Sequence, residues 1–224
     1  MTAAPRPGAP LTPFVDWPPG LVLVLASGSP RRAELLAVAG IPFEVAPAPE
    51  VEHAHAAAAA PMRAEPVRYA AFLAEAKAAA VAARQPGRLV LGADTIVVLD
   101  GEVLEKPADE ADAVRLLRRL AGRVHVVHTA LALLGGPARA RWAGVESTRV
   151  EFLPATEREL RRYVATGEPL DKAGAYGIQG YGALLVRRVE GCYFNVMGLP
   201  LALLGAALRA VLPGGPAPGT EERG

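Results

Sequence analysis

The 224-residue chain lacks several features that mark whole classes of protein. It has one cysteine, Cys192, which excludes an intrachain disulfide framework and fits a reducing cytosol. No apolar run reaches the roughly 18 residues that a membrane span requires, and residues 1–20 lack the charged-then-apolar layout of a signal peptide. A net charge of +1 argues against nonspecific binding of nucleic acid. We therefore expect a cytoplasmic protein that contacts neither membrane nor nucleic acid.

Common phosphate-binding and phosphatase motifs are missing as well. The chain contains no GxxxxGK[ST] sequence and no strand-linked GxGxxG sequence, so neither a Walker-type nor a Rossmann site is supported. Cys192 also lacks the HCxxxxxR context of a cysteine phosphatase, and no internal repeat is visible. Any binding of anions must therefore come from local clusters of charge.

The hydrophobic pattern predicts an α/β domain over residues 21–212, between flexible ends at 1–20 and 213–224. Strands are expected at 21–26, 42–46, 89–99, 102–105, 124–134, 140–152, 183–189 and 192–196. Helices are expected at 30–39, 67–84, between Asp109 and Gly122, at 156–165 and at 199–212, with an irregular Ala/Pro-rich insertion at 53–66. This mixed order predicts a mixed central sheet flanked by helices.

The segment Ser27-Gly28-Ser29-Pro30-Arg31-Arg32 is the most informative part of the chain. An apolar strand precedes it and a helix follows, with Ser29 expected at the N-cap and Pro30 at the first helical position. Each arginine in that first turn is unfavourable by about 0.3–1 kcal/mol unless an anion lies in front of it. The segment therefore predicts a phosphate-binding site, the alternative being a solvated basic first turn.

Polar residues also interrupt apolar patterns elsewhere. Asp94 lies inside the expected strand 89–99, where a buried carboxylate is costly unless it is paired or bound to a metal. It is interpreted as a general base or a metal ligand, the alternative being an edge residue that faces the surface. Lys106 follows a hairpin turn, and Pro107 would hold it near Asp94, although alone it would be an ordinary surface lysine. Lys77 lies on an apolar helix stripe, and by itself we expect it to extend to solvent.

A glycine-rich segment, 171–182, carries four glycines together with Asp171, Lys172 and Gln179. Glycine allows the backbone to approach a ligand, and the polar groups supply charge and an amide that can read a base edge. His125 and His128 would face opposite sides of a strand, so a shared metal is not expected. Glu50 and Glu52 would share one side if the chain is extended there, as a possible metal pair.

Together, these residues resemble the Maf family of nucleoside triphosphate pyrophosphatases. The resemblance covers roughly 21–212 and is carried by LVLASGSPRRAELL, LAEAKA, LGADTIVVLDGEVLEKP, EPLDKAGAYGIQGYG and VMGLPL, in that order. The Ala-rich 53–66 segment and Glu75 depart from the family pattern. The resemblance implies a two-lobed α/β fold with a deep cleft, shared with inosine-triphosphate pyrophosphatases, and a homodimer.

The resemblance also implies roles for individual residues. Asp94 matches the proton acceptor of the family. Lys77, Lys106, Ser27, Arg31 and Arg32 match residues that hold the triphosphate or assist catalysis, and Asp171 and Lys172 would contribute as well. Glu52 matches the acidic residue after the second strand. With Asp94 it would hold a divalent ion, Mg²⁺ or Mn²⁺, that bridges carboxylates and phosphate oxygens.

Arg31, Thr95 and Gln179 resemble the residues of the family branch that acts on dTTP and UTP. The branch acting on 7-methyl-GTP differs at these positions. The expected reaction is attack of water on the α-phosphorus, which releases a nucleoside monophosphate and pyrophosphate. The alternative from another class is a nucleotide-binding regulator of cell division without catalysis, which would have no need of a base such as Asp94.

Overall fold

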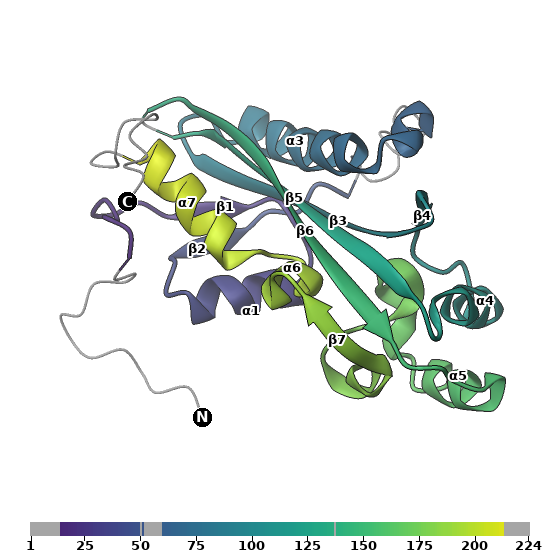
Figure 1. Ribbon diagram of the computed structural model, residues 1–224. Coiled ribbons are helices and arrows are strands. Elements are labelled where there is room, and N and C mark those ends of the chain that lie inside the picture. Colours follow the sequence, from purple (N-terminus) through teal and green to yellow (C-terminus); the bar gives the residue numbers. More distant parts are fainter. Residues whose placement is uncertain (1–13, 50, 52–59, 137, 213–224) are drawn as a thin grey trace, which may run out of the picture.

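A mixed sheet runs through the computed structural model, which describes residues 14–49, 51, 60–136 and 138–212 (Figure 1). Its seven strands are β1 Leu23–Leu25, β2 Phe43–Val45, β3 Leu89–Leu99, β4 Glu102–Leu104, β5 Val124–Gly135, β6 Ala140–Phe152 and β7 Val186–Glu190. They lie in the order β2-β1-β3-β5-β6-β7, with β4 beside β3. Strand β1 is parallel to β2 and β3, and the remaining pairs are antiparallel. The expected mixed sheet of an α/β protein is confirmed.

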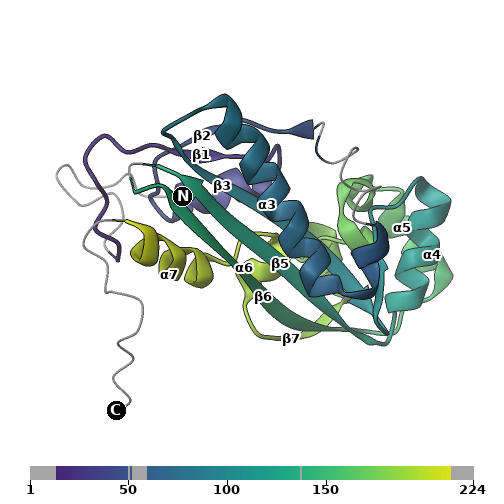
Figure 2. The same cartoon turned by 90° about the horizontal axis from the view of Figure 1, so that it is seen from above.

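Helices cover both faces of this sheet. They are α1 Pro30–Val38, α3 Pro66–Arg84, α4 Glu110–Leu120, α5 Glu157–Val164, α6 Tyr193–Met197 and α7 Leu201–Val211. Helix α3 packs on one face over β3 and β5, whereas α1, α6 and α7 lie on the other face and α4 and α5 lie beyond one end of the long strands (Figures 1 and 2). Each face has its own apolar core, because successive residues of a strand point to opposite sides.

The local patterns explain most of these elements. Helix α4 begins where the Asp109 side chain accepts a hydrogen bond from the Asp112 amide at 2.8 Å. Helix α5 begins with a complete capping box between Thr156 and Glu159. Helix α1 begins after Ser29 as expected, although the Ser29 side chain makes no capping hydrogen bond. Among the described residues, no helix is long and apolar enough to cross a membrane.

The strand expected at 192–196 is wrong, because these residues form α6, and residues 183–185 end a 3-10 helix, Gly180–Leu185, rather than starting a strand. The physical reason is tertiary. The buried Asn195 amide donates to the Val127 carbonyl and to Thr148 Oγ1, both at 2.9 Å, and the short helix ends at Gly198 with a φ of 104°. These bonds outweigh the strand propensity of the local sequence. Of the expected insertion at 53–66, residues 53–59 lie outside the described residues, and the remainder forms a 3-10 helix, Ala60–Ala64, and leads into α3 at Pro66.

An opening in the sheet edge positions the site. The start of β3 pairs with β1 through Val90 and Leu91, and its end pairs with β4 from Val97 onward, on the side opposite β5. Asp94 and Thr95 lie between these two pairings, where neither short strand covers the edge. The loop that leaves β1 and the loop that leaves β4 therefore meet at this gap.

Candidate active site

A cavity of about 570 Å³ lies at this gap in the sheet edge. Its wall includes the β1–α1 loop at 27–32, two central β3 positions, the loop after β4, and the segment 168–180 with its short 3-10 helices Glu168–Asp171 and Ala173–Ala175. It brings together all but one of the predicted site residues: Ser27, Arg31, Arg32, Lys77, Asp94, Thr95, Lys106, Asp171, Lys172 and Gln179. The exception, Glu52, lies outside the described residues, as does Glu50.

Asp94 and Lys77, which both line the cavity, form a buried ion pair. Lys77 Nζ lies 2.8 Å from Asp94 Oδ1, with side chains only 7% and 13% exposed. The expectation that Lys77 extends to solvent is therefore wrong, and the Asp94 side chain, although it lies at the gap in the sheet edge, is buried rather than solvent-facing. Burial of two charges is costly unless they are paired.

Close packing of α3 on β3 creates this pair. A Cβ atom at Gly92 would lie 2.8 Å from the Ala78 amide nitrogen and would also collide with the Ala74 carbonyl. Glycine at this position therefore lets the α3 backbone approach the strand, and Lys77 reaches the carboxylate two residues along β3. Asp94 shares this face of the sheet with Val90 and Ile96, which belong to the core under α3.

Arg32 organises the opposite face. Its guanidinium is buried and donates to Ser27 Oγ at 2.8 Å, to Thr95 Oγ1 at 3.0 Å and to the Gly198 carbonyl at 2.9 Å. Consecutive β3 residues point to opposite sides, so Thr95 meets Arg32 while Asp94 meets Lys77. The planar fork of arginine fits three acceptors in fixed directions, as lysine would not. Arg32 thus fixes the loop, the strand and the end of α6 around the cavity.

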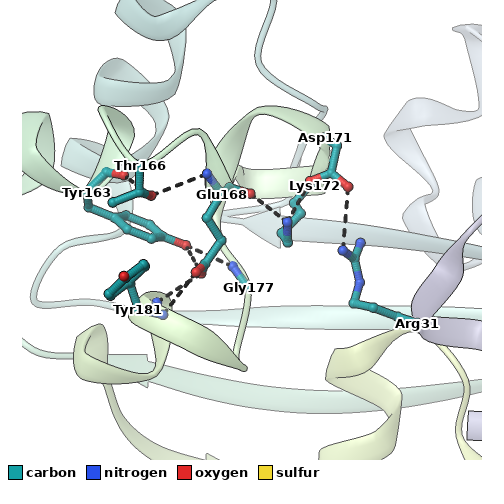
Figure 3. A network of polar contacts seen from close by, with 9 residues as sticks. Arg31, Tyr163, Thr166, Glu168, Asp171, Lys172, Gly177 and Tyr181 are labelled. Atoms are coloured by element: carbon teal, nitrogen blue, oxygen red, sulfur yellow. Dashed lines mark hydrogen bonds and ion pairs between the residues drawn. The ribbon is translucent and has the colours of Figure 1, made fainter. Parts of the chain in front are cut away.

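Arg31 points to a different wall. Its guanidinium lies 3.5 Å from Asp171, whose carboxylate also pairs with Lys172 Nζ at 2.6 Å (Figure 3). Although partial burial opposes it, pairing with Lys172 and Arg31 holds the pKa of Asp171 below its usual range. The anion expected in front of the first turn of α1 is thus supplied in part by Asp171.

Two predicted residues are left exposed at the cavity mouth. Within the described part of the chain, neither the Lys106 ammonium nor the Gln179 amide has a hydrogen-bond or ion-pair partner. Lys106 follows β4, and Gln179 precedes the 3-10 helix Gly180–Leu185. Exposed, unpaired donors at the rim of a cavity are available to a ligand.

Sequence reasoning missed three contributors to the site. Glu168 and Tyr176 both line the cavity, and Asn195 supports it through Thr129, whose hydroxyl bonds the Asn195 carbonyl at 2.9 Å and Thr95 Oγ1 at 3.0 Å. For none of the three does the neighbouring sequence indicate which residue it contacts in the fold. The signal that was available is the position of Tyr176 inside the glycine-rich segment and of Glu168 three residues before it.

His125 and His128 do face opposite sides of β5, which confirms that they share no site. The His125 ring is buried and its Nε2 lies 2.8 Å from the Tyr176 hydroxyl, while His128 bonds Ser147. Burial lowers the pKa of His125 to about 4, so the ring is neutral near pH 7. It supports the cavity wall from beneath.

The donor set of the cavity fits a hard divalent cation. Among the described residues no cluster of three or more potential ligands occurs, yet Mg²⁺ is commonly held by one or two carboxylates with substrate phosphates and waters completing the shell. The Asp94 carboxylate, at the centre of the cavity, provides one such ligand.

Comparisons with known proteins show which family this chain resembles over most of its length. A family model described as Maf-like protein matches residues 22–211. A dTTP/UTP pyrophosphatase of Symbiobacterium thermophilum is 54% identical over 181 residues, 80% of this chain and 88% of that protein. One from Koribacter versatilis is 50% identical over 183 residues, covering 82% and 91%. One from Dictyoglomus turgidum is 45% identical over 186 residues, covering 83% and 94%.

Proposed function

The chain belongs to the Maf family, and we propose that it hydrolyses dTTP and UTP to the nucleoside monophosphate and pyrophosphate. The observation that carries this proposal is the buried Asp94–Lys77 pair, which faces basic and amide groups across one cavity. A protein that only bound nucleotide would gain nothing from a carboxylate at the place where the phosphates must lie. Desolvation of that carboxylate is a cost that catalysis explains.

Asp94 is the proposed general base. Lys77 occupies Oδ1, so Oδ2 is left to accept a proton from the attacking water. The hydroxide forms a bond to the α-phosphorus, the bond from that phosphorus to the bridging oxygen breaks, and pyrophosphate leaves. Lys77 holds the carboxylate in place through a buried, charge-assisted hydrogen bond.

The basic residues would bind the triphosphate. Arg31, Lys106 and Lys172 surround the open part of the cavity, where their charges oppose the charge that develops on the leaving pyrophosphate. Ser27 lies at the start of the same loop, and Arg32 orients its hydroxyl. In this arrangement Arg32 acts mainly by holding the loop, whereas Arg31 meets the ligand.

Arg31, Thr95 and Gln179 are the proposed determinants of base selectivity. The Gln179 amide can donate to one atom and accept from another, as the pyrimidine edge of uracil or thymine requires. Thr95 would act indirectly on the bound base, because its hydroxyl is already hydrogen-bonded to Arg32 and Thr129. Arg31, paired with Asp171, connects the phosphate-binding loop to the segment that carries Gln179.

We further propose that Asp94 and Glu52 hold a divalent ion, Mg²⁺ or Mn²⁺. When bound, such an ion neutralises phosphate charge and polarises the phosphorus–oxygen bonds. The proposal for Asp94 rests on its place in the cavity, and that for Glu52 rests on the family resemblance alone.

The larger organisation is also a proposal. We take residues 21–212 as one Maf-like domain, and we take its two lobes and deep cleft from the family resemblance. Of the two ends that the sequence predicts to be flexible, residues 1–13 and 213–224 lie outside the described residues. Within the described residues, the Trp17 indole donates to the Leu21 carbonyl at 2.9 Å, so the approach to the first strand is ordered at that point. A cytoplasmic homodimer is the proposed form, and the single cysteine supports a reducing environment.

Hydrolysis in ¹⁸O-labelled water tests the reaction. The protein is incubated with dTTP, UTP, CTP, GTP or 7-methyl-GTP in the presence of Mg²⁺ or Mn²⁺. The products are then separated, and mass spectrometry determines which of them carries ¹⁸O. We expect pyrophosphate from dTTP and UTP above all, with the label in the monophosphate. Label in the pyrophosphate would place the attack at the β-phosphorus, and nucleotide binding without turnover would support a regulatory binder instead.

A further inference from the structure

We propose that Glu168 is a positioning residue that fixes the conformation of the base-reading segment, defined here as residues 177–182, and thereby sets the selectivity of Gln179. This inference rests on the proposed function, because selectivity has meaning only if the cavity accepts nucleotides. It goes beyond that function in assigning selectivity to a carboxylate that is outside the set of residues carried over from the family.

Figure 3 shows the Glu168 carboxylate among Tyr163, Gly177 and Tyr181, and these contacts fall on both sides of Gln179 in the sequence. Its Oε2 accepts from the Tyr181 amide at 2.9 Å, and its Oε1 accepts from the Gly182 amide at 3.0 Å. Oε1 also accepts from the Tyr163 hydroxyl at 2.8 Å, and that hydroxyl in turn accepts from the Gly177 amide at 3.1 Å. One carboxylate therefore holds the backbone on both sides of Gln179. It bonds Tyr181 and Gly182 directly, and it holds Gly177 indirectly through the Tyr163 hydroxyl.

The fit between the carboxylate and the backbone is close. A Cβ atom at Gly180 would lie 2.5 Å from Glu168 Oε2, and Gly180 has a φ of 69°. Only glycine satisfies both conditions without displacing either the carboxylate or the chain. The backbone beside Gln179 is thus shaped around Glu168.

Gln179 has no support of its own. Its side chain is exposed, and among the described residues it makes no hydrogen bond. The position of its amide relative to a base is therefore decided by the backbone from which it extends. Since Glu168 holds that backbone on both sides of Gln179, it fixes the point from which the amide extends before a ligand arrives.

The ionised form of Glu168 suits this task. Three donors converge on its two oxygens, and all three come from neutral groups. Although partial burial opposes them, the amides of Tyr181 and Gly182 and the Tyr163 hydroxyl lower the pKa of Glu168. Lys172 does not compete for the carboxylate, because its Nζ donates to the Glu168 carbonyl and to Asp171.

Glu168→Gln is the sharpest variant, since glutamine has the same size but only one acceptor oxygen. Its NH₂ group must then face at least one of the amide or hydroxyl donors, which leaves that donor unpaired. Tyr163→Phe is a milder second variant that folds even if the first does not, because it keeps the carboxylate and its bonds from the Tyr181 and Gly182 amides. It removes only the hydroxyl that donates to Glu168 and accepts from the Gly177 amide. Glu157→Gln on α5, exposed and paired with Arg161, is the matched control.

The experiment compares UTP with ribose 5′-triphosphate, which carries the phosphates but no base. For Glu168→Gln we expect KM for UTP to rise about tenfold, as one unpaired donor near the site implies, with kcat and the hydrolysis of ribose 5′-triphosphate unchanged. Tyr163→Phe should shift KM in the same direction by less, and Glu157→Gln should match the unaltered protein.

The outcomes separate the two proposals. An unaltered protein that hydrolyses neither dTTP nor UTP overturns the proposed function. A protein that is active, but whose Glu168→Gln and Tyr163→Phe variants keep the UTP preference of the unaltered enzyme, overturns the role of Glu168 alone. Equal losses on UTP and ribose 5′-triphosphate in both variants also contradict it, because they indicate a general structural role.

Discussion

The two ends of the cavity, which we propose to bind the phosphates and the base and call the phosphate end and the base end, are built in different ways. At the phosphate end, Arg32, Lys77 and Asp94 come from α1, α3 and β3, Ser27 comes from the loop that precedes α1, and each of the four is buried. At the base end, Gln179 extends from a segment of short 3-10 helices and is exposed. Groups that perform chemistry must be held within a fraction of an ångström, whereas groups that read a base can be placed by a loop.

The two ends also differ in what their polar bonds connect. The phosphate-end bonds join segments that are far apart in the sequence, such as Arg32 with Gly198 and Thr95. The base-end bonds are shorter in range, such as Glu168 with Tyr181 and Gly182. The first set therefore depends on the whole fold, while the second can be remodelled without changing the core. Variants at each end should separate turnover from selectivity.

Asp94→Asn should have the largest effect. An amide cannot take the proton from water, so kcat should fall by about 10²–10⁴-fold with KM for UTP little changed. Because Lys77 loses its buried partner charge, the free energy of unfolding should also fall, by up to about 3–5 kcal/mol. Steady-state kinetics and urea unfolding measure the two effects. Asp100→Asn, in an exposed ion pair with Arg123, is the control, and turnover by folded Asp94→Asn at the original rate would contradict the role of general base.

Lys106→Ala should also abolish most turnover, but without a cost in stability. Removal of one positive donor to the developing charge is expected to lower kcat by about 10²–10³-fold, or about 2.7–4 kcal/mol. Lys106 is exposed and, among the described residues, unpaired, so the midpoint of urea unfolding should stay unchanged. Arg115→Ala, on the surface of α4, should change neither quantity. If Lys106→Ala lowers the free energy of unfolding as much as Asp94→Asn does, the distinction between buried groups and groups at the cavity rim is wrong.

The phosphate end was largely predictable from sequence because its signals are local. A strand, a Gly/Ser loop and a helix that starts at Pro30 place two arginines at one point, and an aspartate inside an apolar strand requires a partner. The identity of that partner was not predictable, since Lys77 and Asp94 meet only because Gly92 lets α3 approach β3.

The base end was predictable only in outline. Its glycines and Gln179 indicated a ligand-binding segment, but Glu168 looks like any acidic residue before a proline, and its donors are backbone amides that have no sequence signature. The strand expected at 192–196 was wrong for a related reason. The bonds that make it a helix come from Val127 and Thr148, on other strands.

Lowering the pH should destabilise the protein through His125, which contacts Tyr176 at the base end of the cavity. Burial gives His125 a pKa of about 4 in the folded protein against 6.5 when exposed. Between these values the unfolded chain binds a proton that the folded chain does not, so stability falls as pH falls from 6.5 toward 4, by about 3 kcal/mol. Urea unfolding across this range should show a smaller loss for His125→Gln than for the unaltered protein. His128→Gln, at the half-exposed site, should keep most of the loss, and identical profiles for all three would contradict this assignment.

The smallest expected effect is a change of base preference in Gln179→Glu. A carboxylate only accepts hydrogen bonds, so it repels the O4 acceptor of uracil but can accept from the N4 amino group of cytosine. The ratio of kcat/KM for UTP to that for CTP should therefore fall by about tenfold, or 1.4 kcal/mol, at unchanged stability. Glu190→Gln, on exposed β7, should leave the ratio as it is. Since Asp94 and Lys77 stay intact, ribose 5′-triphosphate should be hydrolysed at the original rate. A change confined to nucleotides that carry a base would support a role of the loop in selectivity and of the sheet residues in catalysis. A change that extends to ribose 5′-triphosphate would contradict this division of roles.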